Sequence, residues 1–110
     1  MTLVTFSYGK DGVIKECKAN GHAGFSKKGN DIVCAAVTIL IRTAMQVLSH
    51  NENVLLITEP SARGFLSFTV EAKTESPETE TQLKCLGDFL RTGIKALTKE
   101  FPENVILMEE

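Results

Sequence analysis

The segment from Ile32 to Leu48 is the strongest constraint on how this chain folds. Its polar positions recur every four residues, at Thr38, Arg42 and Gln46, and form one narrow stripe along a helix, while almost every other position is apolar. A helix of this kind has to be covered on most of its sides. We therefore expect it to pack against other elements of the chain. We also expect a second copy of the chain to cover part of what remains, so the predicted assembly is a homodimer.

Two strands are predicted before this helix. Residues 3–8 alternate apolar and polar side chains, which is strand spacing, and residues 13–20 form a second predicted strand after a turn at residues 9–12. The two strands are expected to form a hairpin. Cys17 shares the apolar face of the second strand and is expected to fill the core, as is Cys85 further along the chain.

Two more strands and a second helix are predicted after it. Residues 54–59 and 65–72 are strands on either side of a turn, and Ser76 with Pro77 marks the start of the second helix. The apolar face of that helix comprises Leu83, Leu86, Leu90, Ile94, Leu97 and Phe101. Residues 104–108 form a possible short last strand. The order ββαββα, with this possible C-terminal strand, predicts a single two-layer α/β (α+β) domain over residues 1–110.

The composition narrows the function classes. A formal net charge of −2 over 110 residues lacks the basic excess that nucleic-acid binding usually requires. The longest apolar run, residues 32–41, is interrupted by Thr38 and stopped by Arg42, so it is expected to be too short to cross a membrane. Three cysteines without a CxxC pair argue against disulfides and structural zinc, and residues 1–10 lack a secretory pattern. We expect a cytoplasmic protein.

The stretch NGHAGFSKKGNDIVCAAV, residues 20–37, carries His22 and Cys34 on either side of a polar loop. A thiol attacks as the thiolate, and both a helix N-terminus and a nearby imidazole lower a thiol pKa. Asn30 or Asp31 is expected to cap the helix after a loop at residues 23–30, which puts Cys34 in the first turn beside free backbone N–H groups that stabilise an oxyanion. Because the loop spans up to about 27 Å when extended, Cys34 and His22 can meet as a dyad.

Other interpretations of these residues stay open. An apolar-flanked cysteine is usually a small core residue, and a lone histidine at a strand end usually lies on the surface. In a thiol redox protein Cys34 would be the reactive sulfur, with Cys17 as its resolving partner. A non-catalytic ribosome- or RNA-binding module is the third alternative, although the acidic balance counts against it. Asp31 is expected to be a cap rather than a catalytic residue.

One further property of this stretch is a family resemblance. Gly21-His22-Ala23, then Gly29, then the run from Asp31 to Thr38, DIVCAAVT, resembles the signature of the ribosomal-processing cysteine proteases, a bacterial family of small cytoplasmic proteins. The resemblance extends to overall length and element order and is diffuse outside residues 21–38. Position 38 departs from the pattern, because threonine stands where serine is usual.

The resemblance implies both an activity and the residues that carry it. It implies a homodimeric α/β domain that needs no cofactor or metal. It implies that Cys34 is the nucleophile and His22 its base. The implied substrate is the precursor of a large-subunit ribosomal protein, the twenty-seventh in the usual series, from which an N-terminal extension is removed. The roles of Asp31 and Thr38 stay open.

Overall fold

The chain alternates strands and helices in the predicted order. The computed structural model describes residues 1–21, 28–59 and 64–110, and of residues 28–31 the backbone alone. The last strand, predicted as possible, is present. The elements are β1 (Thr2–Tyr8), β2 (Ile14–Gly21), α1 (Lys28–Ser49), β3 (Val54–Thr58), β4 (Phe65–Ala72), α2 (Pro77–Glu100) and β5 (Val105–Glu109).

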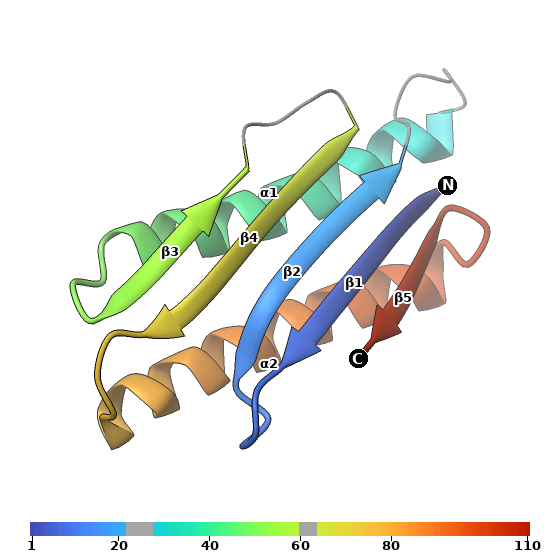
Figure 1. Cartoon of the computed structure of the whole chain (residues 1–110). Helices are drawn as coiled ribbons and strands as arrows, with labels where there is room; N and C mark the ends of the chain where they lie inside the picture. The colour runs from blue at the N-terminus through green and yellow to red at the C-terminus, as the bar shows by residue number, and fades with distance from the viewer. Residues whose placement is uncertain (22–27, 60–63) are drawn as a thin grey trace.

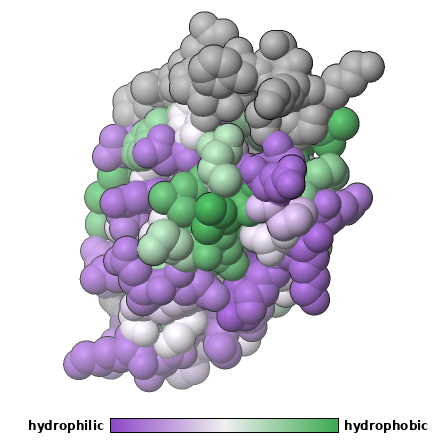
Figure 2. Space-filling view, turned by 90° about the vertical axis from the view of Figure 1, so that its right-hand side faces the viewer, coloured by the Kyte–Doolittle hydropathy of each residue, from purple (hydrophilic) through white to green (hydrophobic). Residues whose placement is uncertain are grey.

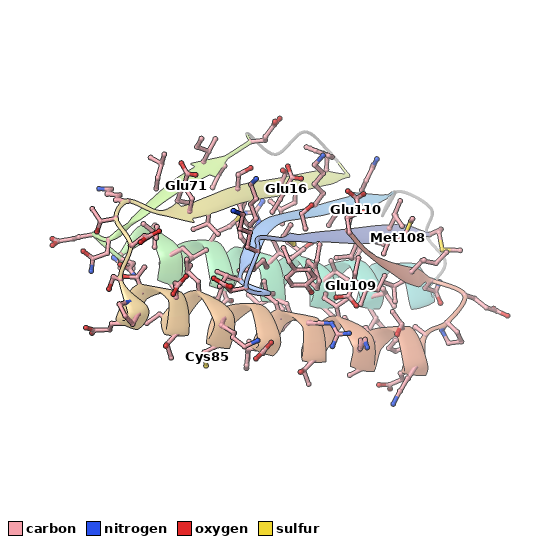
Figure 3. The ribbon with its side chains drawn as sticks, turned by 60° about the horizontal axis from the view of Figure 1, so that its bottom comes forward. Glu16, Glu71, Cys85, Met108, Glu109 and Glu110 are labelled. Carbon is pink, nitrogen blue, oxygen red and sulfur yellow. The ribbon has the colours of Figure 1, made fainter. Side chains whose placement is uncertain are left out.

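The strands form one sheet in the order β3-β4-β2-β1-β5. β5 runs parallel to β1, and every other pair of neighbours is antiparallel. Both helices lie on the same face of this sheet (Figure 1). Glu16 and Glu71 lie on the opposite face, which no described element covers (Figure 3). The domain therefore has the predicted two layers, and β3 and β5 are the two edges of the sheet.

The core lies between the sheet and the helices. The alternation of the strands directs one set of side chains toward the helices, and Cys17 is fully buried among them, as predicted. The strands contribute Val4, Phe6, Ile14, Cys17, Ala19, Val54, Phe68, Val70 and Val105. The helices contribute Val33, Val37, Ile41, Ala44, Leu48, Leu83, Leu90 and Ile94.

The start of α2 follows its sequence signals. The Ser76 hydroxyl accepts a hydrogen bond of 3.3 Å from the backbone N–H of Thr79, and Pro77 is the first helical residue. The prediction that Cys85 fills the core is wrong, because Cys85 is exposed and lies on the side of α2 away from the sheet (Figure 3). Position 85 follows the buried Leu83 by two residues, which is about 200° around a helix.

The predicted hairpin of β1 and β2 contains a bulge. Ser7 pairs with Glu16 but Tyr8 pairs with Ile14, so Lys15 is an extra residue on β2. A bulge reverses the alternation of a strand locally. Here it places Ile14, which is 1% exposed, on the helix side of the sheet.

Helix α1 is apolar over a longer stretch than predicted. The window Ile32–Ser49 has a mean hydropathy of 1.8 and would be long and apolar enough to cross a membrane by length and composition alone. The expectation that this run is too short was therefore wrong. Core helices of water-soluble domains meet the same criterion, and the buried side of α1 packs on the sheet. Ile32, Ile39 and Val47 stay more than half exposed on the side away from the sheet.

The β5 edge carries a small apolar surface. On the side of the molecule shown in Figure 2, hydrophobic residues gather at the centre and hydrophilic residues surround them. Ile106 and Met108 of β5 are both exposed. A groove between β5 and α2 has Lys95, Lys99 and Glu109 among its lining residues. Charged groups therefore border the apolar part of this edge.

The end of β2 is crossed closely by the start of the chain. A Cβ atom on Gly21 would lie 2.6 Å from the Thr2 Cα and would overlap the Met1 carbonyl oxygen. The Gly21 N–H also donates to the Gly64 carbonyl, at 2.9 Å. Gly64 has φ of +84°, and a Cβ there would lie 2.7 Å from the Gly21 oxygen. Only glycine fits at either position, so the last residue before His22 is held between two other segments.

One polar cluster ties β5 to α2 and β1. The Glu109 carboxylate accepts hydrogen bonds from the Arg91 Nε and the Tyr8 hydroxyl, both at 2.6 Å. The hydrogen bond from Arg91 and then that from Tyr8 lower the pKa of Glu109 below its ordinary value of 4.5. Burial, followed by the bond to Glu109, raises the pKa of Tyr8. The cluster fixes the end of the chain on the helix layer.

Replacing Glu109 by glutamine tests this cluster. A carboxylate whose pKa is lowered by folding stabilises the protein above its unfolded pKa, and that contribution is lost as the pH falls through the lowered value. We expect Glu109→Gln to unfold at lower urea than the wild type at pH 7. The difference should shrink as the pH falls below 4.5. Glu110→Gln, at an exposed neighbour, is the control. A deficit in Glu109→Gln that does not depend on pH would contradict this account.

Replacing Gly21 by alanine tests the crossing at the end of β2. The added methyl has backbone atoms rather than flexible side chains around it, so the start of β1 has to shift. We expect a loss of about 1–3 kcal/mol in the free energy of unfolding, measured in urea. Gly9→Ala is the matched control, because a Cβ there meets its nearest atom, the Val13 oxygen, at 3.7 Å. Equal stability of the two variants would show that the crossing is not tight.

Candidate active site

Cys34 lies on α1 with a half-buried side chain and a free thiol. The helix begins at Lys28, so Cys34 is its seventh residue rather than a residue of its first turn. The prediction of a cap at Asn30 or Asp31 was therefore wrong, and residues 28–30 belong to the helix rather than to the loop. Such residues cap a helix only where their own backbone is non-helical. Here both positions are helical, and an acidic residue is favoured within a first turn.

The start of α1 at Lys28 changes which backbone groups are available near the Cys34 sulfur. An N–H at the seventh position has its own acceptor four residues back, so the N–H of Cys34 is not among those left free at the helix end. The field of the helix dipole also weakens beyond the first turn. The predicted oxyanion donor and the predicted help from the helix end are therefore not supplied by this arrangement.

His22 lies outside the described residues, directly after Gly21. The end of β2, the start of β1 and the start of α1 lie at the same end of the molecule (Figure 1). Gly21 is held there against Met1, Thr2 and Gly64. Gly21, the residue before His22, is therefore fixed at the end of the domain where α1 begins. The pairing of His22 with Cys34 stays a prediction.

The other two cysteines differ from Cys34 in their surroundings. Cys17 is fully buried, and burial followed by the charge of Glu16 raises the pKa of its thiol to about 12. A resolving cysteine acts as a thiolate, so Cys17 is poorly suited to serve as the partner that the redox alternative requires. Cys85 is exposed on the outer side of α2. Cys34 is the one cysteine in the described chain that is neither sealed in the core nor open to solvent.

A groove runs between α1 and β3 on the same side of α1 as Cys34. Cys34, Thr38, Arg42, Met45 and Ser49 are spaced by three or four residues and therefore share one side of the helix. The groove has a volume of about 470 Å³ and is lined by Arg42, Met45, Gln46, Ser49, Leu56, Thr58, Glu59 and Leu66.

This groove was not predicted from the sequence. Its one signal was the polar stripe of Thr38, Arg42 and Gln46, interpreted there as a property of the helix alone. Arg42 and Gln46 border the groove on the α1 side. The half-buried Thr38 lies one turn after Cys34 on the same side. Its role stays a prediction.

The fold matches those of several solved structures. The ribosomal processing protease Prp from S. aureus in complex with a covalently linked product peptide has a TM-score of 0.79 at 17% identity, with 100% of both chains covered. The same protease in complex with a substrate peptide has a TM-score of 0.81 at 14% identity, again over 100% of both chains. SMU.848 from Streptococcus mutans has a TM-score of 0.75 at 26% identity, over 100% of this chain and 96% of that one.

The sequence comparisons give the family. No curated protein matches the chain. The model of the family described as cysteine protease Prp matches residues 1–106, nearly the whole chain. This match agrees with the signature around His22 and Cys34 and with the fold shared with the Prp structures. The chain therefore belongs to the Prp family of cysteine proteases.

Proposed function

We propose that this protease removes the N-terminal extension from the precursor of the twenty-seventh protein of the large ribosomal subunit. The observation that carries the proposal is the signature from Gly21 to Thr38, within a chain that the Prp family model matches over residues 1–106. The structurally similar Prp of S. aureus is a ribosomal processing protease that binds a substrate peptide. The whole chain, residues 1–110, acts as one cysteine-protease domain.

In this proposal Cys34 is the nucleophile and His22 its base. His22 takes the proton of the Cys34 thiol, and the sulfur attacks the scissile carbonyl carbon to form a tetrahedral intermediate. As the C–N bond breaks, His22 donates that proton to the leaving amine, and an acyl-enzyme remains on the sulfur. Water, activated by His22, then hydrolyses the thioester and restores the thiol. The residues need no metal or cofactor for these steps.

The proposed setting is the cytoplasm, where free thiols persist. All three cysteines are free in the structure. The net charge of −2 supports contact with a protein precursor rather than direct binding to nucleic acid or membrane.

The proposed active form is a homodimer. Ile32, Ile39 and Val47 of α1 are spaced by seven and eight residues, so they form one stripe on the side away from the sheet. Phe89 of α2 is 67% exposed. An exposed apolar stripe on a helix layer supports an interface with a second copy of the chain, which would bury the same stripe in each copy.

Substitution of the two proposed catalytic residues tests the activity. With the ribosomal protein precursor of the same organism as substrate, we expect Cys34→Ala to lower kcat/KM by about a thousandfold or more, because the nucleophile is lost. We expect His22→Ala to lower it by about a hundredfold or more with an unchanged unfolding midpoint. Mass spectrometry of the precursor follows the cleavage.

The exposed Cys85 provides the matched control. Cys85→Ala should cleave the precursor as the wild type does. Alkylation by iodoacetamide at neutral pH should modify Cys34 faster than Cys85, and His22→Ala should remove that difference. The assignment would be refuted if Cys34→Ala still cleaves the precursor, or if Cys34 is alkylated at the same rate in His22→Ala as in the wild type.

A charge on the outer stripe of α1 tests the dimer. Ile39 is 63% exposed, and a glutamate there would bury a charge in the proposed interface. We expect the wild type to sediment as a dimer and Ile39→Glu as a monomer in analytical ultracentrifugation. Ile57→Glu is the control, at a β3 residue that is 57% exposed. A wild type that is monomeric at micromolar concentration, or an effect of Ile57→Glu alone, would contradict this interface.

A further inference from the structure

The free edge of β3 has hydrogen-bonding groups directed away from the sheet. The Glu59 N–H donates to the Ser67 oxygen at 3.1 Å, and the Lys73 N–H donates to the Asn53 oxygen at 2.9 Å. Bonded residues alternate along an antiparallel pair, so residues 53, 55, 57 and 59 bond to β4. The backbone groups of Leu56 and Thr58 therefore point outward. β3 is an edge of the sheet, so these groups face away from the described strands.

The same two residues also line the groove beside α1. Leu56 and Thr58 line the groove together with Met45 of α1 and Leu66 of β4. An extended chain that bonds to the backbone of these residues would direct every second side chain to one face. That face is the groove. Its half-buried lining residues Met45, Leu56 and Leu66 form an apolar floor, and the exposed Arg42 and Glu59 form its rim. The β3 edge could therefore bind the backbone of an extended peptide while the adjacent groove binds its side chains.

The groove is within reach of a peptide held at Cys34. At a rise of 1.5 Å per residue, Arg42 lies about 12 Å along α1 from Cys34, and Ser49 about 22 Å. An extended peptide covers about 3.3 Å per residue. The groove therefore meets substrate residues that are about four to seven positions from the scissile bond. Because these residues share one side of α1, the peptide need not cross the helix.

We propose that an extended segment of the substrate adds to the free edge of β3 as an extra strand and places alternate apolar side chains in the groove. This inference rests on the proposed protease function and extends it to a second recognition site, away from the reacting bond. Thr58 and Leu56 supply the backbone contacts, and Met45, Leu56 and Leu66 supply the apolar floor. Specificity then depends on the length and apolar pattern of the substrate as well as on the cleaved residues.

Proline at position 58 tests the strand addition. The Thr58 N–H faces outward, so Thr58→Pro removes a donor at the edge and none that bonds to β4. The substrates are two peptides copied from the precursor, a short one with about two residues on either side of the scissile bond and a long one with about eight. We expect Thr58→Pro to lower kcat/KM about fivefold to tenfold for the long peptide, mainly through KM, and to leave the short peptide unchanged.

Three further variants control for a folding defect. Thr58→Val keeps the backbone N–H, so its loss of kcat/KM on the long peptide should be clearly smaller than that of Thr58→Pro. Gln46→Trp fills the groove from the exposed side of α1 without changing β3 and should weaken cleavage of the long peptide alone, and Gln46→Ala should weaken it less. Unfolding midpoints and the alkylation rate of Cys34 confirm that each variant keeps its fold and its nucleophile.

The outcomes separate the two proposals. If the wild type cleaves both peptides equally well, or if Thr58→Pro and Gln46→Trp cleave the long peptide normally, the β3 site is wrong and the protease proposal stands. If the wild type cleaves neither peptide and leaves the precursor intact, the proposed substrate is wrong, and the proposed β3 site for that substrate is wrong as well. A selective loss on the long peptide in both variants supports the site.

Discussion

Phe6 and Phe68, on β1 and β4, are completely buried between the sheet and the two helices. Their burial requires each strand to direct one of its two alternating sets of side chains into the core, and it requires both helices to lie on that face. The arrangement leaves the other face of the sheet and the outer sides of the helices without a covering element in the described chain. The exposed apolar residues of α1 and the free edge of β3 follow from this one-sided core.

The features that were predicted from the sequence are those set by local patterns. Alternation located the strands, and Ser76 with Pro77 located the start of α2. The sheet order and the bulge at Lys15 depend on pairing between distant segments, which no local pattern records. Cys85 was misplaced because an apolar residue type does not reveal which side of an amphipathic helix it occupies; its position relative to Leu83 does.

The candidate site was predictable in its residues and less so in its geometry. The signature singled out His22 and Cys34, but the start of α1 at Lys28 removes Cys34 from the helix end. Asn30 and Asp31 have the residue types of a cap, and residue type alone does not fix backbone conformation. Gly21 shows the opposite case. Its place in the signature has a physical reason, the contact with Thr2 and Gly64, that becomes visible only in three dimensions.

The two edges of the sheet differ in a way that bears on substrate binding. Edge strands expose unpaired backbone groups, and proteins usually protect them with charges or with covering elements. At β5, Glu109 is bonded to Arg91, and Lys95 and Lys99 line the adjacent groove. Both edge strands expose apolar side chains, but the groove beside β3 is lined by Met45, Leu56 and Leu66 with a single cation, Arg42, and a single carboxylate, Glu59. The free edge of β3 lies beside α1, the helix that carries Cys34. A peptide in extended form can bind there, because the backbone of the peptide can form hydrogen bonds with the outward groups of β3 without any change in the domain.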